Sequence, residues 1–347
     1  MIKSIPYALA IAAAAISGAA QSITLTQIST PFNTPIGIDY HEPTQSVIAS
    51  VNYGSGGSPY NLERILLDGT HTQFSSVSGL TDELKIATVR SGNMGGFTTG
   101  EVFTGTGVDG EIIRISANGS TSVNPWVSLP GDNNGLMRGS LYVDRTGVYG
   151  GDLIVGTTAG EVWRINSSGT PTMIADVDEH LEGLMSVPNN SAQYGPLAGK
   201  IIAGAEGSGR MYVFDNTGLV STLSLGVAIE DIDLIEPNEN FFGVNYGSGR
   251  ILGAPAADFA SMAGDILLTQ EHHGGSGLYR LAWDGTALSA WELTLGLGSE
   301  TPSQWEHVTF APAGIVEINP TVPEASTWIA GMLLSLGTAA TYLRRRA

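Results

Sequence analysis

One short phrase recurs through the middle of the chain, and it restricts the fold more than any other feature of the sequence. Each copy alternates apolar and polar residues and ends in a polar residue and a glycine, which is typical of a strand entering a tight hairpin. Three successive intervals between the closing glycines are 50, 50 and 49 residues. The five copies are LERILLDG (62–69), EIIRISANG (111–119), EVWRINSSG (161–169), RMYVFDNTG (210–218) and GLYRLAWDG (277–285).

Two further phrases precede each hairpin and extend the repeat to four strands. A segment of small and aliphatic residues, such as GGDLIVGTTAG at 150–160, suits a strand packed between two neighbours. Another phrase opens each unit, and its successive intervals are 48, 52, 48, 48 and 76 residues. The residues aligned in this opening phrase are Ile36, Leu84, Leu136, Leu184, Ile232 and Val308.

A four-stranded unit every ~40–50 residues is typical of a β-propeller blade. We therefore predict an all-β fold, a six-bladed β-propeller over residues 21–318. Five or seven blades, or a β-sandwich, are the alternatives. Because only five of the six openings belong to complete units, we expect residues 22–30 to close the ring by pairing with residues 307–318. We interpret the long last interval as an insertion at 241–259.

Charge and cysteine content exclude several classes of function. The chain has 33 acidic and 15 basic residues. It therefore lacks the surplus of Lys and Arg that contacts to nucleic acid phosphates require, and we expect no nucleic acid partner. The acidic surplus suits divalent cations, or simply keeps the protein soluble. The chain has no cysteine, which excludes disulfides, thiolate catalysis and cysteine-ligated zinc.

The first twenty residues have the pattern of a secretory signal peptide. Lys3 is followed by a short apolar run, and Gly18, Ala19 and Ala20 provide the small residues that a signal peptidase needs. The apolar run is too short for a membrane-spanning helix. We predict a signal peptide at residues 1–20 and export of the rest of the chain.

The other end of the chain is predicted to enter a membrane. No charged residue lies between Glu324 and Arg344, and a helix of this length would reach about 28 Å, close to the thickness of the hydrocarbon layer. Basic residues stay on the cytoplasmic side of a membrane. We predict a linker at 319–325 and a transmembrane helix at 326–347, held in place by Arg344, Arg345 and Arg346.

The residues before this segment sharpen the prediction. Val322, Pro323 and Glu324, followed by an apolar span and an arginine cluster, resemble the PEP-CTERM sorting signal of exported bacterial proteins. That pattern usually has a second proline where this chain has Ala325. The resemblance covers about the last twenty-six residues. It implies transient anchoring in the inner membrane, cleavage near Pro323 by an exosortase-type membrane enzyme, and a final place at the cell surface or outside the cell. It also implies an association with extracellular polysaccharide.

Acidic residues recur at the openings of the repeat units. The first strand of each blade lines the central channel of a propeller, so equivalent positions form a ring around it. Carboxylates in such a ring repel one another, and a bound Ca²⁺ or another divalent cation relieves the repulsion. A metal site there is one interpretation, and a hydrated acidic channel without a tightly bound ion is the alternative; the candidate ligands are Glu83, Glu182, Glu230 and Glu306.

Two readings of function follow from these features. The first is an exported, surface-sorted propeller that acts as a non-catalytic binding or matrix component. The alternative is a secreted metal-dependent hydrolase of the lactonase type, because the ring of carboxylates resembles the metal site of lactonase-type propellers. In that case His307 would be the general base. The sequence GTGVDG at 105–110 fits a dinucleotide-binding pattern, but a predicted strand follows it and not a helix, so we reject it.

Overall fold

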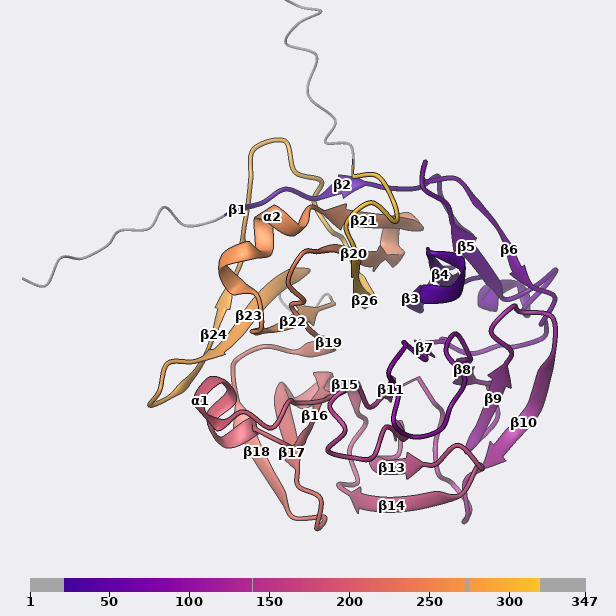
Figure 1. Cartoon of the computed structure of the whole chain (residues 1–347), viewed down its shortest axis with the longest axis horizontal. Coiled ribbons are helices and arrows are strands. Elements are labelled where there is room, and N and C mark those ends of the chain that lie inside the picture. Colours follow the sequence, from indigo (N-terminus) through magenta and orange to yellow (C-terminus); the bar gives the residue numbers. More distant parts are fainter. Residues whose placement is uncertain (1–21, 139, 272–274, 319–347) are drawn as a thin grey trace, which may run out of the picture.

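The computed structural model describes residues 22–138, 140–271 and 275–318. Six antiparallel sheets of four strands stand around a central channel (Figure 1), so the predicted six-bladed β-propeller is confirmed. The strands of the first three blades follow one another in chain order. The first blade contains β3 (Ile38–His41), β4 (Ser46–Ser50), β5 (Leu62–Ile65) and β6 (His71–Ser75). The second contains β7 (Ile86–Thr88), β8 (Val102–Gly105), β9 (Glu111–Ile115) and β10 (Ser122–Ser128), and the third β11 (Ser140–Val143), β12 (Leu153–Gly156), β13 (Glu161–Ile165) and β14 (Pro171–Asp176).

The fourth blade repeats this order, whereas the fifth is interrupted. The chain leaves the fifth blade after its innermost strand and returns for the other three. The fourth blade contains β15 (Glu182–Ser186), β16 (Ile201–Ala205), β17 (Arg210–Phe214) and β18 (Val220–Ser224). The fifth contains β19 (Ile229–Leu234), β22 (Ile266–Gln270), β23 (Gly277–Trp283) and β24 (Leu288–Glu292).

The sixth blade is assembled from three separate parts of the chain. Its middle strands are β20 (Glu239–Asn245) and β21 (Arg250–Ala254), a hairpin that lies between β19 and β22 in the sequence. Its innermost strand is β26 (Trp305–Pro312), which pairs with β20, and its outermost strand is β2 (Thr26–Gln27), which pairs with β21. The predicted pairing of 22–30 with 307–318 is therefore wrong in detail. The two segments belong to the same blade, but the hairpin at 239–254, which we interpreted as an insertion, separates them.

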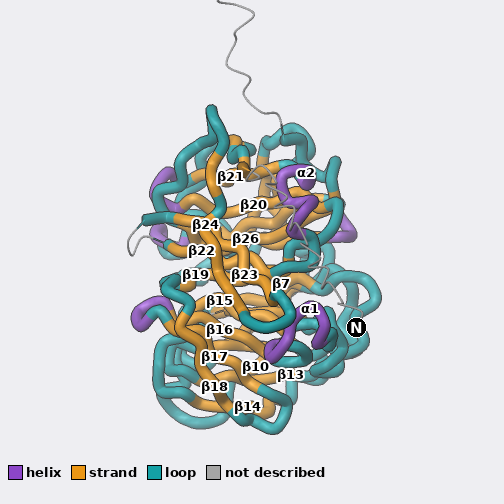
Figure 2. The backbone as a smooth tube through the Cα atoms, turned by 90° about the vertical axis from the view of Figure 1, so that its left-hand side faces the viewer, coloured by secondary structure: helices purple, strands orange, loops and turns teal. Residues whose placement is uncertain are grey.

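The remaining elements are short. A parallel pair joins β1 (Ser22–Ile23) to β25 (Thr294–Leu295) beside the fifth blade. The side view of Figure 2 shows both α-helices on the same side of the ring. The α-helices are α1 (Ser191–Tyr194) and α2 (Ala256–Phe259). The 3₁₀ turns are η1 (Glu42–Thr44), η2 (Tyr53–Ser55), η3 (Gly195–Leu197), η4 (Glu206–Ser208), η5 (Tyr246–Ser248) and η6 (Ala260–Met262).

The glycines that close the repeated hairpins are needed for two reasons. All five have positive φ angles, between 71° and 95°, which side chains with a Cβ rarely adopt. Some of them also touch the preceding blade. A Cβ at Gly69 would lie 2.0 Å from the carbonyl oxygen of Ile28, and one at Gly119 would lie 2.3 Å from that of Phe74. Glycine at these positions therefore allows each hairpin to turn and also allows neighbouring blades to approach closely.

The innermost strands give the channel two different ends. These strands all run in the same direction along the channel, so their first residues meet at one end and their last residues at the other. The connections that carry α1 and α2 lie at the second end, which faces the viewer in Figure 1. The innermost strands are β3, β7, β11, β15, β19 and β26.

The predicted signal peptide, the sorting motif and the membrane span lie outside the described residues. Within the described ranges, no helix is long and apolar enough to cross a membrane.

Candidate cation site at one mouth of the channel

The end of the channel where the innermost strands begin is surrounded by buried acidic side chains, and we call it the carboxylate mouth. The innermost strands position three of these side chains directly, because alternate residues of such a strand point into the channel; the other two, Glu206 and Glu271, enter from turns between other strands. Its central acids are the buried Glu182, Glu230, Glu271 and Glu306 and the half-buried Glu206.

One lysine lies among these acids. The side chain of Lys85 is 1% exposed, and its Nζ lies 3.0 Å from Glu182 Oε2 and 2.7 Å from Glu230 Oε1. Nζ also donates to the backbone carbonyl of Glu230 at 3.0 Å. These contacts occupy the three N–H donors of the ammonium group. The surrounding carboxylates overcome the effect of burial and raise the pKa of Lys85 well above its usual value. Lys85 is therefore a fixed internal cation and not a nucleophile.

Three carboxylates at this mouth are close enough to share one metal ion. Glu206 in η4, Glu230 in β19 and Glu271 after β22 each offer a carboxylate oxygen, and these oxygens all lie within 4.8 Å of one another. Calcium binds oxygen ligands at about 2.3–2.6 Å, so two ligands on opposite sides of one ion are at most about 5 Å apart. The spacing and the all-oxygen chemistry of this trio fit a hard divalent cation.

A glutamine connects the trio to the remaining acid. Gln304 Nε2, just before β26, lies 2.5 Å from Glu271 Oε1 and 3.2 Å from Glu306 Oε1. The amide can donate to both carboxylates because it has two N–H donors. Gln304 therefore holds Glu306 beside the trio.

The protonation states show that this mouth has more acid than its own cations can neutralise. Burial, and then repulsion from Glu271, raises the pKa of Glu206 to about 8. Burial also raises the pKa of Glu230 and of Glu306 well above the usual value, although Lys85 opposes the shift in both. Carboxylates in this condition either hold protons at neutral pH or bind a cation.

Two tyrosines stand at the same rim. The hydroxyl groups of Tyr53 and Tyr246 lie 2.9 Å apart. Tyr53 begins η2 and Tyr246 begins η5, whereas Glu206 begins η4 at the same place in its own blade. Burial, and then the hydrogen bond to Tyr246, raises the pKa of Tyr53, so the Tyr53 hydroxyl stays protonated at neutral pH. The rim therefore offers neutral hydroxyl donors next to the acidic trio.

The structure brings three of the four predicted metal ligands together. Glu182, Glu230 and Glu306 are buried at the carboxylate mouth. Glu83 is 30% exposed and points to Arg138, whose Nε lies 3.1 Å from Glu83 Oε2. Glu83 therefore lies outside the trio that fits a cation. The two oxygens of Glu182 already contact Lys85 and, at 2.7 Å, His180.

His307 lies deeper in the channel than the acids. Its Nδ1 accepts a hydrogen bond from the backbone N–H of Ile38 at 3.1 Å, and its Nε2 lies 3.8 Å from Asp231 Oδ2. Burial, with a further contribution from Lys85, lowers the pKa of His307 to about 3. An imidazole with this pKa is a poor general base, so the geometry does not favour the role that we predicted for it.

The sequence reasoning did not select Lys85, Glu206, Gln304, Tyr53 or Tyr246, although Lys85 and Glu206 each have a signal in the sequence. Lys85 is two residues after Glu83 on a predicted strand, so both point to the channel, but only the acids were considered. The hexapeptide VNYGSG occurs at 51–56 and again at 244–249, and GAEGSG at 204–209 is a variant of it. This repeat places Glu206 at the rim and also identifies 239–254 as part of a blade. Glu271 also has a sequence signal, because it opens the run Glu271-His272-His273, whose residue types suit a metal site; from the sequence alone we interpret this run as a solvated loop, since adjacent residues of a strand point to opposite faces.

Comparison with known proteins supports the fold. No protein-family model matches the chain, and no curated protein matches it in sequence. Among solved structures, a proposed gluconolactonase is similar, with 12% identity and a TM-score of 0.53, covering 82% of this chain and 84% of that one. A chain of a nidogen/laminin complex is similar, with 11% identity and a TM-score of 0.50, covering 84% of this chain and 98% of that one. Likeness at this level of identity shows the propeller fold alone.

Proposed function

We propose that the chain is a divalent-cation-dependent hydrolase of the lactonase type, with its reaction site at the carboxylate mouth. The observation that carries the proposal is the trio of Glu206, Glu230 and Glu271, whose oxygens lie within 4.8 Å of one another. The solved structure of a proposed gluconolactonase has the same fold. The other interpretation of the sequence, a non-catalytic binding component, is supported by no cluster of described residues comparable to this trio.

The residues of the mouth have separate roles in this proposal. Glu206, Glu230 and Glu271 would hold the cation. When bound, it would supply a Lewis acid for an ester carbonyl. Lys85 neutralises part of the charge and fixes Glu230 through a 2.7 Å contact. Glu306 is the best placed general base, because it lies beside the trio through Gln304 and its pKa is raised.

The hydroxyl groups of the rim complete the site. Tyr53 and Tyr246 lie where a substrate would enter the mouth, with their hydroxyl groups 2.9 Å apart, and the raised pKa of Tyr53 keeps its hydroxyl protonated. A phenol can donate a hydrogen bond to a carbonyl or to a leaving alkoxide. We assign them to substrate positioning.

Metal content and hydrolysis of a lactone panel, measured on the same protein, test the proposal. We expect Ca²⁺ or another divalent cation to raise the melting temperature, because it binds the native state only. We expect lactone hydrolysis to stop in a chelator. The double variant Glu206→Gln and Glu271→Gln should lose both responses, while Glu83→Gln, at the same mouth but facing Arg138, should keep them.

The outcomes separate the parts of the proposal. Cation binding that depends on the trio, without hydrolysis of any lactone, would refute the enzyme and leave a cation-binding propeller. Hydrolysis that survives in the double variant would place the chemistry elsewhere.

We also propose that the chain is exported and sorted to the cell surface. The support is the signal peptide pattern at 1–20 and the resemblance of Val322, Pro323 and Glu324, with the arginines at 344–346, to a sorting signal. Signal peptidase, an exosortase-type enzyme and extracellular polysaccharide would then be partners. Mass spectrometry of the mature protein from its native host should find a C-terminus near Pro323. A released protein that still carries Arg346 would refute the sorting mechanism.

A further inference from the structure

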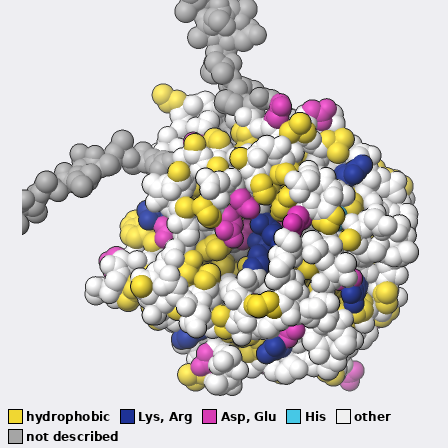
Figure 3. Space-filling model, viewed as in Figure 1, with side chains coloured by type: hydrophobic (Ala, Val, Ile, Leu, Met, Phe, Trp, Pro, Cys, Tyr) yellow, Lys and Arg dark blue, Asp and Glu magenta, His cyan; other side chains and the backbone are white. Residues whose placement is uncertain are grey.

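The opposite end of the channel has a pocket of its own, and we call this end the arginine mouth. In the view of Figure 3, which looks onto this end, basic side chains lie at the centre of the ring with acidic ones beside them. A pocket of about 220 Å³ opens here. Its lining includes Arg90, Ser91, Arg145 and Glu236, from the connections after β7, β11 and β19, and Glu239 at the start of β20.

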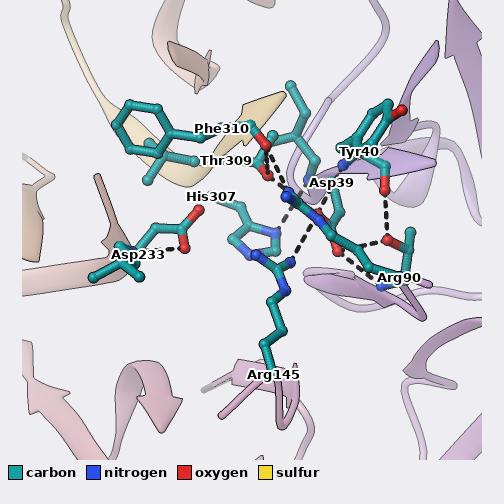
Figure 4. A network of polar contacts seen from close by, with 12 residues as sticks. Asp39, Tyr40, Arg90, Arg145, Asp233, His307, Thr309 and Phe310 are labelled. Carbon is teal, nitrogen blue, oxygen red and sulfur yellow. Dashed lines mark hydrogen bonds and ion pairs between the residues drawn. The ribbon is translucent and has the colours of Figure 1, made fainter. Parts of the chain in front are cut away.

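A buried aspartate fixes the two arginines from below. Asp39 accepts hydrogen bonds from Thr88 N at 2.8 Å and from Thr309 Oγ1 at 3.1 Å, and its Oδ1 lies 3.4 Å from Arg145 Nη2 and 3.8 Å from Arg90 Nη2 (Figure 4). Burial alone would raise the pKa of Asp39, but the two guanidinium groups and these hydrogen bonds hold it below its usual value. Asp39 is therefore ionised, and the guanidinium groups are positioned before any ligand arrives.

Most N–H donors of the Arg145 guanidinium group make no hydrogen bond to the described residues. Its guanidinium group lies over the ring of Tyr142, 5.2 Å from the centroid, and its side chain is 21% exposed. A guanidinium group has five N–H donors. To the described residues, Arg145 donates one hydrogen bond, the 3.4 Å contact with Asp39. The wall of the pocket that Arg145 forms therefore presents unused donors.

The facing wall presents acceptors. Glu239 pairs with Arg90, whose Nη1 lies 3.2 Å from Glu239 Oε2. Glu236 receives no hydrogen bond from a described residue. Burial, and then repulsion from Glu239, raises the pKa of Glu236. Ser91 adds a hydroxyl group, which both donates and accepts, on the rim between the two walls.

We propose that this pocket binds a small neutral polyhydroxylated molecule, of the size of one sugar ring. Each hydroxyl of such a molecule both donates and accepts, so one ligand can use Arg145 and Glu236 together. The carboxylates of Glu236, Glu239 and Asp39 would repel an anion. The guanidinium groups of Arg90 and Arg145 would repel a cation. The volume is below the roughly 300–1,000 Å³ of a drug-sized site. The pocket lies at the other end of the channel from the trio, so the inference is independent of the proposed hydrolase.

Calorimetric titration of the purified protein with five related sugars tests the charge preference. The probes are glucose, glucosamine and glucuronate at one ionic strength, with galactose and mannose as further neutral hexoses. We expect at least one neutral hexose to bind more tightly than both charged sugars. Tighter binding of glucuronate would indicate an anion site, and tighter binding of glucosamine a cation site; either result, or the absence of hexose binding, overturns the proposal.

Variants locate the binding. Arg145→Gln should weaken hexose binding at least tenfold. Arg280→Gln is the matched control, because Arg280 also contacts a carboxylate, Asp265 at 2.6 Å, and an aromatic ring, but on the outer part of the fifth blade. It should change the affinity less than twofold. If Arg145→Gln fails to fold, Glu236→Ala serves instead, because Glu236 receives no hydrogen bond from the described chain. Unchanged affinity in these pocket variants would overturn the assignment.

Discussion

The two mouths of the channel are built by the same six strands, yet they neutralise their buried acids differently. At the arginine mouth, Asp39 has two guanidinium groups and several hydrogen-bond donors, and its pKa is lowered. At the carboxylate mouth, five glutamates surround Lys85, and the pKa of three of them is raised. One end therefore carries its own counter-ions, whereas the other has room for a further cation.

The difference teaches that charge sign alone does not define a metal site in such a channel. Both ends contain more acidic than basic side chains. The residual demand for a cation depends on whether each carboxylate is already paired. Asp39 is already paired with two guanidinium groups, so it needs no further cation. Glu206 instead lies next to two other carboxylates, those of Glu230 and Glu271.

The largest effect is expected from removing the internal cation of the carboxylate mouth. Lys85→Met leaves Glu182 and Glu230 buried without their partner, which typically destabilises a protein by about 3–5 kcal/mol. Chemical denaturation at neutral pH measures this loss. Calcium should restore part of it, because a bound cation replaces the missing charge.

Arg138→Met is the control for Lys85→Met. Arg138 pairs with Asp82 at 2.6 Å at the same end of the channel, but its side chain is 34% exposed. Exposed ion pairs contribute about 0–1 kcal/mol. Equal losses in the two variants would show that Lys85 is not the special counter-ion we describe.

A smaller loss is expected at the arginine mouth. Asp39→Asn keeps the shape of the side chain but removes the charge that holds Arg90 and Arg145. Hydrogen bonds to charged groups contribute about 1.5–3 kcal/mol each, and several remain possible to the amide oxygen, so we expect a loss of about 2–3 kcal/mol. Calcium should give no recovery here. Recovery by calcium would mean that the two ends are not independent.

The dependence of the melting temperature on pH should differ between the calcium-free and the calcium-bound protein. The folded pKa of Glu206 is about 8 and that of Asp231 about 7, both above the usual value. A carboxyl group whose pKa is raised on folding binds its proton more tightly in the native state. Its contribution is therefore complete at acid pH and is lost as the pH rises from about 5 to about 8.

Melting temperatures across this range check the sign. Without calcium we expect a fall of a few degrees towards the upper end, and with saturating calcium a smaller fall, because the cation replaces the proton at Glu206. Glu206→Gln should flatten the profile without calcium. A rise in stability with pH would contradict the protonation states described above.

The smallest effect is expected at the rim. Tyr53→Phe removes the hydroxyl that lies 2.9 Å from Tyr246, and one hydrogen bond is worth about 0.5–1.5 kcal/mol. If the tyrosines position a substrate, the variant should lower the rate of lactone hydrolysis by more than the fold-change that corresponds to its loss of unfolding free energy. An activity loss no greater than that of Glu83→Gln would remove the tyrosines from the site.

The fold could be predicted from the sequence because its repeat is a local property. Alternating residues and a closing glycine every ~50 residues indicate four-stranded units without any long-range information. The sixth blade was misread because its strands come from three distant segments. The repeated VNYGSG at 51–56 and 244–249 was the available signal, since it marks the same turn in two blades.

The candidate site could be predicted only in part. Inward-pointing Glu182, Glu230 and Glu306 follow from their place at the blade openings. Their partners do not, because a carboxylate's neighbour across the channel depends on how six blades are staggered. Lys85 meets Glu230 across 145 positions of sequence. Glu206 and Glu271 enter from turns between other strands, so a search confined to blade openings could not find them.

The route of the chain through the last two blades makes ring closure a late and concerted event in folding. β2 pairs with β21, which lies 227 residues further along the chain. The sheet that contains β20 is complete only when β26 has also paired with it. The fifth blade, in turn, is divided around that hairpin. Pairing over such sequence distances is slow, because the entropy of closing long loops is lost before the contacts form. The first four blades can form in sequence, whereas the last two have to form together, and until then the channel has neither of its two mouths complete.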